Sequence, residues 1–161
     1  MAAPNPPAQA STACASCGSV PVDGYTSCEN MWDDLLAKSF SEFAFARFHR
    51  PIVDAYSLQH PAQYCKSAKS YAAHLTGLCC HIEHQGSSEV NRSVQRWLSG
   101  NVELDKPPVP HHRGDLTLAH VLGAAAPAEI AECLEEWFRS VWAAFSDLHG
   151  TTREWIERVM V

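Results

Sequence analysis

Apolar residues recur at helical spacing along most of this chain, and this periodicity restricts the fold more than any other feature. Successive apolar positions on one face of an α-helix lie three or four residues apart. Two long examples are the sets Tyr71, Leu75, Leu78, Ile82 and Ile130, Leu134, Trp137, Val141, Phe145. No segment shows the strict alternation of a half-buried strand. The pattern predicts an all-α protein, folded as a compact helical bundle.

Capping and breaking residues divide the chain into the expected helices. A short first helix follows Asn30 as its N-cap, and a last helix opens with a capping box at Thr151, just after Gly150. Pro51 lies inside the second expected helix, where a proline usually bends the chain. Residues 102–115 are proline-rich and predict an extended loop. The other helical segments are expected over residues 41–59, 67–84, 88–99, 117–121 and 127–149.

Length and charge narrow the class of protein. A chain of 161 residues fits one domain with its own core, expected over residues 14–161 after a disordered leader, residues 1–13. The net charge is −6 and the twelve Lys and Arg form no block, which argues against nucleic-acid binding and polybasic membrane attachment. No apolar run approaches the roughly 20 residues of a membrane-spanning helix. The N-terminal segment lacks the basic start and apolar middle of a secretory signal, so we expect a cytoplasmic protein.

The sharpest local signal is a loop with three cysteines, residues 14–28. Two residues separate Cys14 from Cys17, which lets both sulfurs reach one tetrahedral ion, and Gly18 permits the tight turn around it. The seven cysteines, an odd number without an export signal, are expected to be thiols. Together with Cys28, the pair suits a borderline metal and predicts a zinc-knuckle-like site. The alternative is a flexible tail whose cysteines do not share a metal ion.

The fourth ligand follows from helix geometry. A helix that rises about 15 Å from Cys28 and reverses at residues 39–41 brings His49 back to the level of the cysteine. The same reasoning across the turn at residues 61–66 places His74 near His49. His49 is therefore the first choice and His74 the second, although a core histidine satisfied by a hydrogen bond is an equal alternative for His74. The predicted metal ligands are Cys14, Cys17, Cys28 and His49.

A carboxylate and two histidines are the candidates for chemistry beside the metal. Asp54 can fix the ring of a metal-bound imidazole or act as a general base. The alternative is a simple ion pair between Asp54 and Arg50 or another cation. The candidate catalytic residues are Asp54, His60 and His74.

Several known signatures are missing, and the other histidines and cysteines carry weaker signals. The chain contains no glycine-rich phosphate loop, no GxGxxG and no HExxH. The HxE run that begins at His81 follows the paired cysteines, whereas in zinc deaminases it precedes them. His81 and His84 could chelate from one helix, but histidines at helix ends often face water. The remaining cysteines are interpreted as small core residues: Cys65, Cys79, Cys80 and Cys133.

Several of these motifs together resemble one family. They are Cys14-x-x-Cys17-Gly18, Cys28, the run His49-Arg50-x-x-Val53-Asp54-Ala55-Tyr56-x-Leu58-Gln59-His60-Pro61, His74-Leu75 and a Trp-rich C-terminal helix. They are similar to an uncharacterised bacterial domain-of-unknown-function family, number five-nine-four-six, over most of the chain. Pro51 departs from the residue usual there. The resemblance supports the helical fold and the motif residues and brings no activity with it.

Two functions follow from the sequence as hypotheses. In the first, the protein binds zinc in a closed structural site and acts as a binding or regulatory module, with a small molecule or another protein as its partner. In the second, it is a small metalloenzyme of a biosynthetic pathway, with its reactive site between the second and third expected helices. Metal stoichiometry in ligand variants distinguishes the two.

Overall fold

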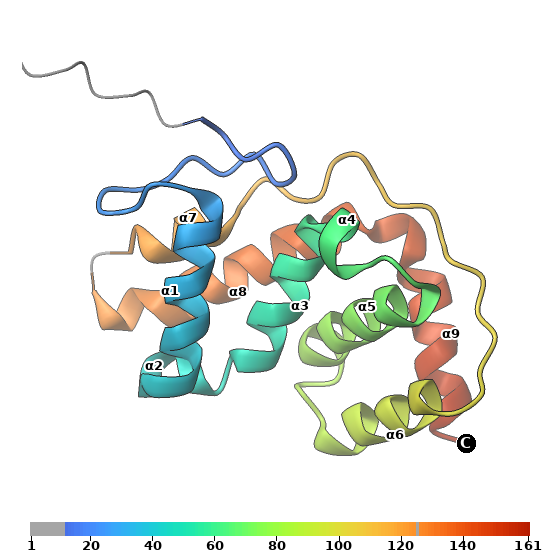
Figure 1. Ribbon diagram of the computed structural model, residues 1–161. Coiled ribbons are helices and arrows are strands. Elements are labelled where there is room, and N and C mark those ends of the chain that lie inside the picture. The colour runs from blue at the N-terminus through green and yellow to red at the C-terminus, as the bar shows by residue number, and fades with distance from the viewer. Residues whose placement is uncertain (1–11, 125) are drawn as a thin grey trace, which may run out of the picture.

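The fold is built from helices only (Figure 1). The computed structural model describes residues 12–124 and 126–161, and this part of the chain contains no β-strand, which confirms the all-α prediction. The predicted leader lies almost wholly outside the described residues. The elements are α1 (Cys28–Ser41), α2 (Phe43–Ala46), α3 (His49–Gln59), α4 (Pro61–Tyr64), α5 (Ala68–Glu83), α6 (Ser88–Ser99), α7 (Leu118–Leu122), α8 (Pro127–Ala144), the 3₁₀ turn η1 (Ser146–Leu148) and α9 (His149–Val159).

Local caps set the ends of several helices. Ser67 accepts a hydrogen bond from the backbone of Ser70 and opens α5 within a residue of the expected start. The bounds of α6 agree with the prediction. The N-cap of α1 is Ser27 rather than Asn30, because the Ser27 hydroxyl accepts from the Asn30 N–H and the helix begins at Cys28. The cysteine of the metal loop therefore lies in the first turn of α1.

The second expected helix is in fact two helices, α2 and α3, separated at Arg47 and Phe48. Phe45 and Phe48 are both buried on either side of this break, so the chain turns where it inserts two aromatic rings into the core. Pro51 is the third residue of α3. A proline in the first turn interrupts no intrahelical hydrogen bond, so the expected bend is absent and α3 simply starts later.

The C-terminal helices also divide at an unexpected place. The structure ends α8 at Ala144 and passes through η1 into α9, so that Gly150 lies within α9 instead of terminating a helix. Phe145 and Leu148 are buried at this bend. Burial of these two side chains therefore decides the break, and the glycine signal in the sequence is overruled by packing.

The core lies where α3 and α5 pack side by side in the middle of the molecule, with α8 crossing α3 (Figure 1). Its largest fully buried side chains include Trp137, Tyr71, Phe138, Phe145, Met31 and Leu35. The extended loop that follows α6 passes around the outside to α7, as predicted from its prolines, and runs beside the N-terminal cysteine loop. None of the described helices is both long and apolar enough to span a membrane.

Candidate metal centre and other candidate sites

Four potential metal ligands meet where the N-terminal loop, α1 and α3 come together. The Sγ atoms of Cys14, Cys17 and Cys28 and a ring nitrogen of His60 all lie within 4.8 Å of one another, a group that could hold a metal ion. The two loop cysteines flank a tight turn in which the Gly18 N–H donates to the Cys14 carbonyl at 2.8 Å. Gly18 has φ +77°, a left-handed conformation that glycine adopts without strain.

The ligand atoms are in contact without being covalently joined. Cys17 Sγ and Cys28 Sγ are 3.7 Å apart, far beyond the about 2.05 Å of a disulfide, and all cysteines are free thiols. His60 Nε2 lies 3.6 Å from Cys14 Sγ and 3.5 Å from Cys28 Sγ. The Ser19 N–H also points at Cys17 Sγ, at 3.4 Å. Sulfur and nitrogen lone pairs thus converge on a common point.

One contact and one backbone hydrogen bond set the protons of these side chains. The hydrogen bond between Cys17 and Cys28 lowers the pKa of the Cys28 thiol and raises the pKa of the Cys17 thiol, so the pair holds one proton between the two sulfurs. His60 Nδ1 lies 2.7 Å from the Tyr56 carbonyl, to which it donates. That bond places the proton on Nδ1 and leaves the Nε2 lone pair directed at the sulfurs.

His60, and not His49 as predicted, lies with the three cysteines. His49 Nδ1 instead contacts the Ser39 hydroxyl at 2.8 Å, and its ring lies against Phe40. Because α1 and α3 are antiparallel, the last turn of α1 meets His49 while its first residue, Cys28, meets His60 at the other end. His74, the second choice, is not in the group either.

A signal for His60 existed in the sequence. Cys28 precedes Ser39 by the same number of residues by which His60 follows His49, so an antiparallel pairing that joins one pair also joins the other. The chain reverses later than residues 39–41, because α1 continues to Ser41 and α2 precedes α3. His49 therefore lies level with the last turn of α1 and not with Cys28.

A hollow of about 350 Å³ lies beside this group, and Cys14, Cys28 and His60 line it. Trp32 and Tyr64 line it, and Tyr56 stacks between Trp32 and His60 with ring centroids 3.9 Å apart on both sides. Stacking holds the imidazole plane in place. The hollow gives solvent access to the edge of the centre near Cys14.

Asp54 and His74 form a separate pair, between α3 and α5. Asp54 Oδ1 lies 2.9 Å from His74 Nδ1, and Arg50 Nε lies 3.5 Å from the other carboxylate oxygen. Of the three predicted catalytic residues, Asp54 and His74 lie together, whereas His60 lies with the cysteines. Their catalytic role remains a prediction.

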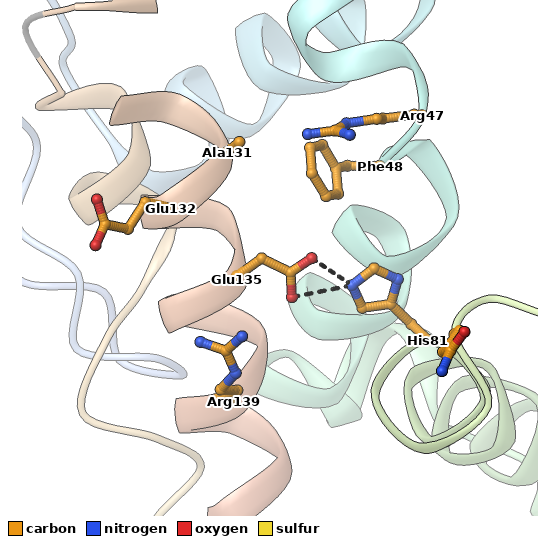
Figure 2. A pocket seen from close by; sticks show the side chains of 8 residues that line it. Arg47, Phe48, His81, Ala131, Glu132, Glu135 and Arg139 are labelled. Atoms are coloured by element: carbon orange, nitrogen blue, oxygen red, sulfur yellow. Dashed lines mark hydrogen bonds and ion pairs between the residues drawn. The ribbon is translucent and has the colours of Figure 1, made fainter. Parts of the chain in front are cut away.

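A second acid–histidine pair joins α5 to α8 (Figure 2). His81 Nε2 lies 3.0 and 3.2 Å from the two carboxylate oxygens of Glu135. Arg47 and Arg139 line the same surface cavity, whose volume is about 480 Å³. His81 therefore pairs across the interface, and among the described residues neither His81 nor His84 belongs to a group of three or more potential metal ligands.

The remaining cysteines confirm the core interpretation with one exception. Cys65, Cys79 and Cys80 are buried, and burial raises the pKa of both Cys65 and Cys79 to about 12. Cys133 is only half-buried and forms a three-residue group with His120 and Glu136 that the sequence analysis missed. His120 and Glu136 are already paired at 2.6 Å. No local spacing links α7 to α8, so only the tertiary structure reveals this group.

Comparison with known proteins gives one match. Residues 12–146 match a family described as a family of unknown function, DUF5946. The chain belongs to this family. The matched segment includes the four residues of the candidate metal centre and both members of the Asp54–His74 pair, whereas the whole of α9 lies beyond it. No curated protein matches this DUF5946 chain, and no solved structure matches it.

Proposed function

We propose that this protein binds one zinc ion through Cys14, Cys17, Cys28 and His60, and that the ion is structural. The distances between the ligand atoms carry the proposal. Zinc with bonds of about 2.3 Å to sulfur and about 2.0 Å to nitrogen has tetrahedral edges of about 3.8 Å between sulfurs and about 3.5 Å between sulfur and nitrogen. The Cys17–Cys28 distance of 3.7 Å and the two distances to His60, 3.5 and 3.6 Å, fit these edges.

The donor set favours zinc over other ions. Three thiolates and one imidazole suit a borderline cation, whereas magnesium and calcium require oxygen ligands. Four protein ligands complete a tetrahedron and leave no position for water or substrate, which is the arrangement of a structural site. The hollow beside Cys14 therefore gives access to the ligands but not to an open coordination position.

The position of the centre supports a structural role. It lies where the N-terminal loop meets α1 and the end of α3. Two hydrogen bonds reinforce the same junction: the Ser16 hydroxyl donates to the Gln59 carbonyl at 2.8 Å, and Arg113 donates to the Ser16 carbonyl. In this proposal zinc binding stabilises a cytoplasmic binding or regulatory module, whose partner is a small molecule or a protein.

Zinc content of single-ligand variants tests the proposal. The protein is purified under reducing conditions, and zinc per chain is measured by plasma mass spectrometry. We expect one tightly bound zinc in wild type and loss of that zinc in His60→Gln, with a lower melting temperature. His49→Gln is the matched control, since it removes a histidine at the other end of α3 and should retain the zinc.

A second control addresses the surface group. Cys133→Ser removes a cysteine outside the centre, so the tightly bound zinc should remain. If His60→Gln keeps a full equivalent of zinc, or if His49→Gln loses it, the assignment of His60 is wrong. A zinc that is lost without any change in melting temperature would contradict the structural role.

A further inference from the structure

Asp54 is a buried carboxylate whose partners do not fully satisfy it. Its side chain is only 5 % exposed, and Oδ2 forms no hydrogen bond with any described residue. The nearest cation to Oδ2 is Arg50 Nε, at 3.5 Å and outside hydrogen-bond geometry. Burial raises the pKa of Asp54, while His74 and Arg50 oppose the shift. Such a group costs stability, which is typical of residues retained for function.

The neighbouring helix makes room for this carboxylate. Gly77 lies within α5, and a Cβ atom placed on it would lie 2.1 Å from Asp54 Oδ2. Glycine inside a helix costs roughly 1 kcal/mol relative to alanine. Only glycine allows Asp54 to lie against α5 and reach His74. The buried acid and the helical glycine each cost stability, and both are needed for the contact between Asp54 and His74.

The pair prepares His74 as a proton acceptor. Because Asp54 accepts a hydrogen bond at Nδ1, the proton of the neutral ring resides there and Nε2 carries the lone pair. Nε2 forms no hydrogen bond within residues 12–124 and 126–161. The His74 side chain is 19 % exposed and lines a cavity of about 290 Å³ between α3 and α5. The free nitrogen is therefore accessible from that cavity.

The cavity also contains the means to hold an anion. Arg50 and His49 line it, and the Arg50 side chain is one-third exposed. The only carboxylate among the residues that line it is Asp54, which is directed to His74 and Arg50. Val53 and Ala73 supply apolar walls. A guanidinium in a small, partly apolar cavity is suited to a carboxylate or phosphate group.

We propose that this cavity is a proton-transfer site for a small oxyanion-bearing molecule, in which Arg50 binds the oxyanion and His74 removes a proton. In the step, an N–H bond forms at His74 Nε2 and the O–H or activated C–H bond of the substrate breaks. The electron pair of that bond stays on the substrate. Asp54 does not take the proton: it positions the ring and stabilises the imidazolium.

The His81–Glu135 pair is an internal control, because it is the same type of contact on another face (Figure 2). Glu135 contacts His81 through Nε2 and is itself 31 % exposed, so water can replace it. We therefore expect loss of Glu135 to affect His81 only weakly. Loss of Asp54 should affect His74 strongly, since no water replaces a buried partner.

Chemical modification tests the proton acceptor. Diethyl pyrocarbonate acylates unprotonated imidazole nitrogens, and peptide mass spectrometry measures the rate at each histidine at neutral pH. In Asp54→Asn we expect the rate at His74 to fall by about tenfold, whereas in Glu135→Gln the rate at His81 should change little and the rate at His74 should stay unchanged. Zinc content should be unchanged in both. An unaltered His74 rate in a folded Asp54→Asn protein overturns the proposal.

Binding of simple oxyanions tests the anion site. Acetate and inorganic phosphate are titrated separately while the His74 ring resonances are followed by NMR. We expect a saturable shift of the His74 signal in wild type that is lost in Arg50→Gln and kept in Arg139→Gln, which removes an arginine from the cavity at His81. Equal shifts in both variants, or no saturable shift at His74 with either anion, would refute the site.

Discussion

At the scale of single residues, the fixed nitrogen of each histidine decides what the ring can do. His60 donates from Nδ1 to the Tyr56 carbonyl and presents Nε2 to the sulfurs. His74 is held at Nδ1 by Asp54, which leaves Nε2 to the cavity. His49 has its Nδ1 on the Ser39 hydroxyl and its ring against an exposed phenylalanine, far from the thiolates. The same side chain thus has three different environments in this chain.

Asp54 gives a prediction on pH and stability. Burial raises its pKa in the folded state, so its contribution to stability is fully present below the unfolded pKa of about 4 and is lost as the pH rises through the folded pKa. Asp54→Asn, which is uncharged, should therefore be more stable than wild type at pH 7, by about 1 kcal/mol. The difference should shrink as the pH falls towards 4. Urea unfolding at a series of pH values measures it.

An exposed carboxylate is the control for this prediction. Asp115, which is 90 % exposed, can be replaced by Asn with an expected change within about 0.5 kcal/mol at every pH. If Asp54→Asn is instead less stable than wild type at pH 7, the carboxylate is a stabilising ion-pair partner. The carboxylate would then stabilise the fold and would not cost stability.

The residues of the metal centre differ in how far the sequence reveals them. Cys14 and Cys17 belong to one tight turn, so their spacing alone predicts a shared ion. Cys28 is close to them in sequence, so the loop spacing predicts it too. The position of His60 depends on the register between α1 and α3, and this register depends on where α1 begins and where the chain reverses. If the reversal is placed too early in the chain, His49 instead of His60 is expected beside Cys28.

At the scale of helices, capping residues and glycines predict a helix end correctly where no core packing competes with them. They predict it wrongly where burial of core side chains sets the break. The start of α5 at its Ser67 cap and the end of α6 before Gly100 follow from the sequence. The breaks before α3 and after α8 do not, because each exists to bury phenylalanine rings against other helices. The helical spacing of apolar residues continues across such a break, so the sequence pattern does not reveal where one helix ends and the next begins.

The contact between α3 and α5 gives a prediction through Gly77. Gly77→Ala should destabilise the protein by about 2 kcal/mol, because the new methyl group overlaps the Asp54 carboxylate and must displace it. In an Asp54→Ala background the obstacle is removed, and the same change should stabilise the protein by up to about 1 kcal/mol, since alanine favours a helix. Urea unfolding of the four proteins gives the coupling energy.

Gly150→Ala is the matched control for this cycle. Gly150 also lies within a helix, α9, and nothing lies within 4 Å of a Cβ atom built on it. The substitution should therefore be neutral or stabilising, with or without Asp54. If Gly77→Ala has the same effect in both backgrounds, Asp54 is not the group that requires the glycine.

At the scale of the whole molecule, the end of α3 joins parts that are distant in sequence. Gln59 is fully buried: its Oε1 accepts from Trp137 Nε1 at 3.0 Å, and its Nε2 donates to the carbonyls of Arg113 and Leu116. His60, the next residue, contacts the cysteine loop. Two adjacent side chains therefore connect α8, the long loop and the metal centre.

Replacement of this buried amide tests the junction. Gln59→Leu leaves the buried Trp137 N–H and the carbonyls of two half-buried residues without their partner, so we expect a loss of about 3 kcal/mol in the free energy of unfolding. Gln63→Leu, at an exposed glutamine four residues later, should change stability by less than about 0.5 kcal/mol. Similar values for both variants would show that Gln59 does not hold the junction.

Removal of the metal tests how far the junction extends. In the proposed zinc form, the N-terminal loop is fixed by the ion and by the hydrogen bond between Arg113 and Ser16, so loss of zinc should loosen both partners of that bond. After treatment with a chelator, we expect hydrogen exchange to increase in residues 12–27 and in residues 111–117. Exchange in α5, whose buried face packs against α3, should change little.

The control is His49→Gln, which before chelation should show the same hydrogen exchange as wild type. Faster exchange confined to residues 12–27 would show that the long loop is held by Gln59 alone, and uniform loss of protection would show that the whole core depends on the ion.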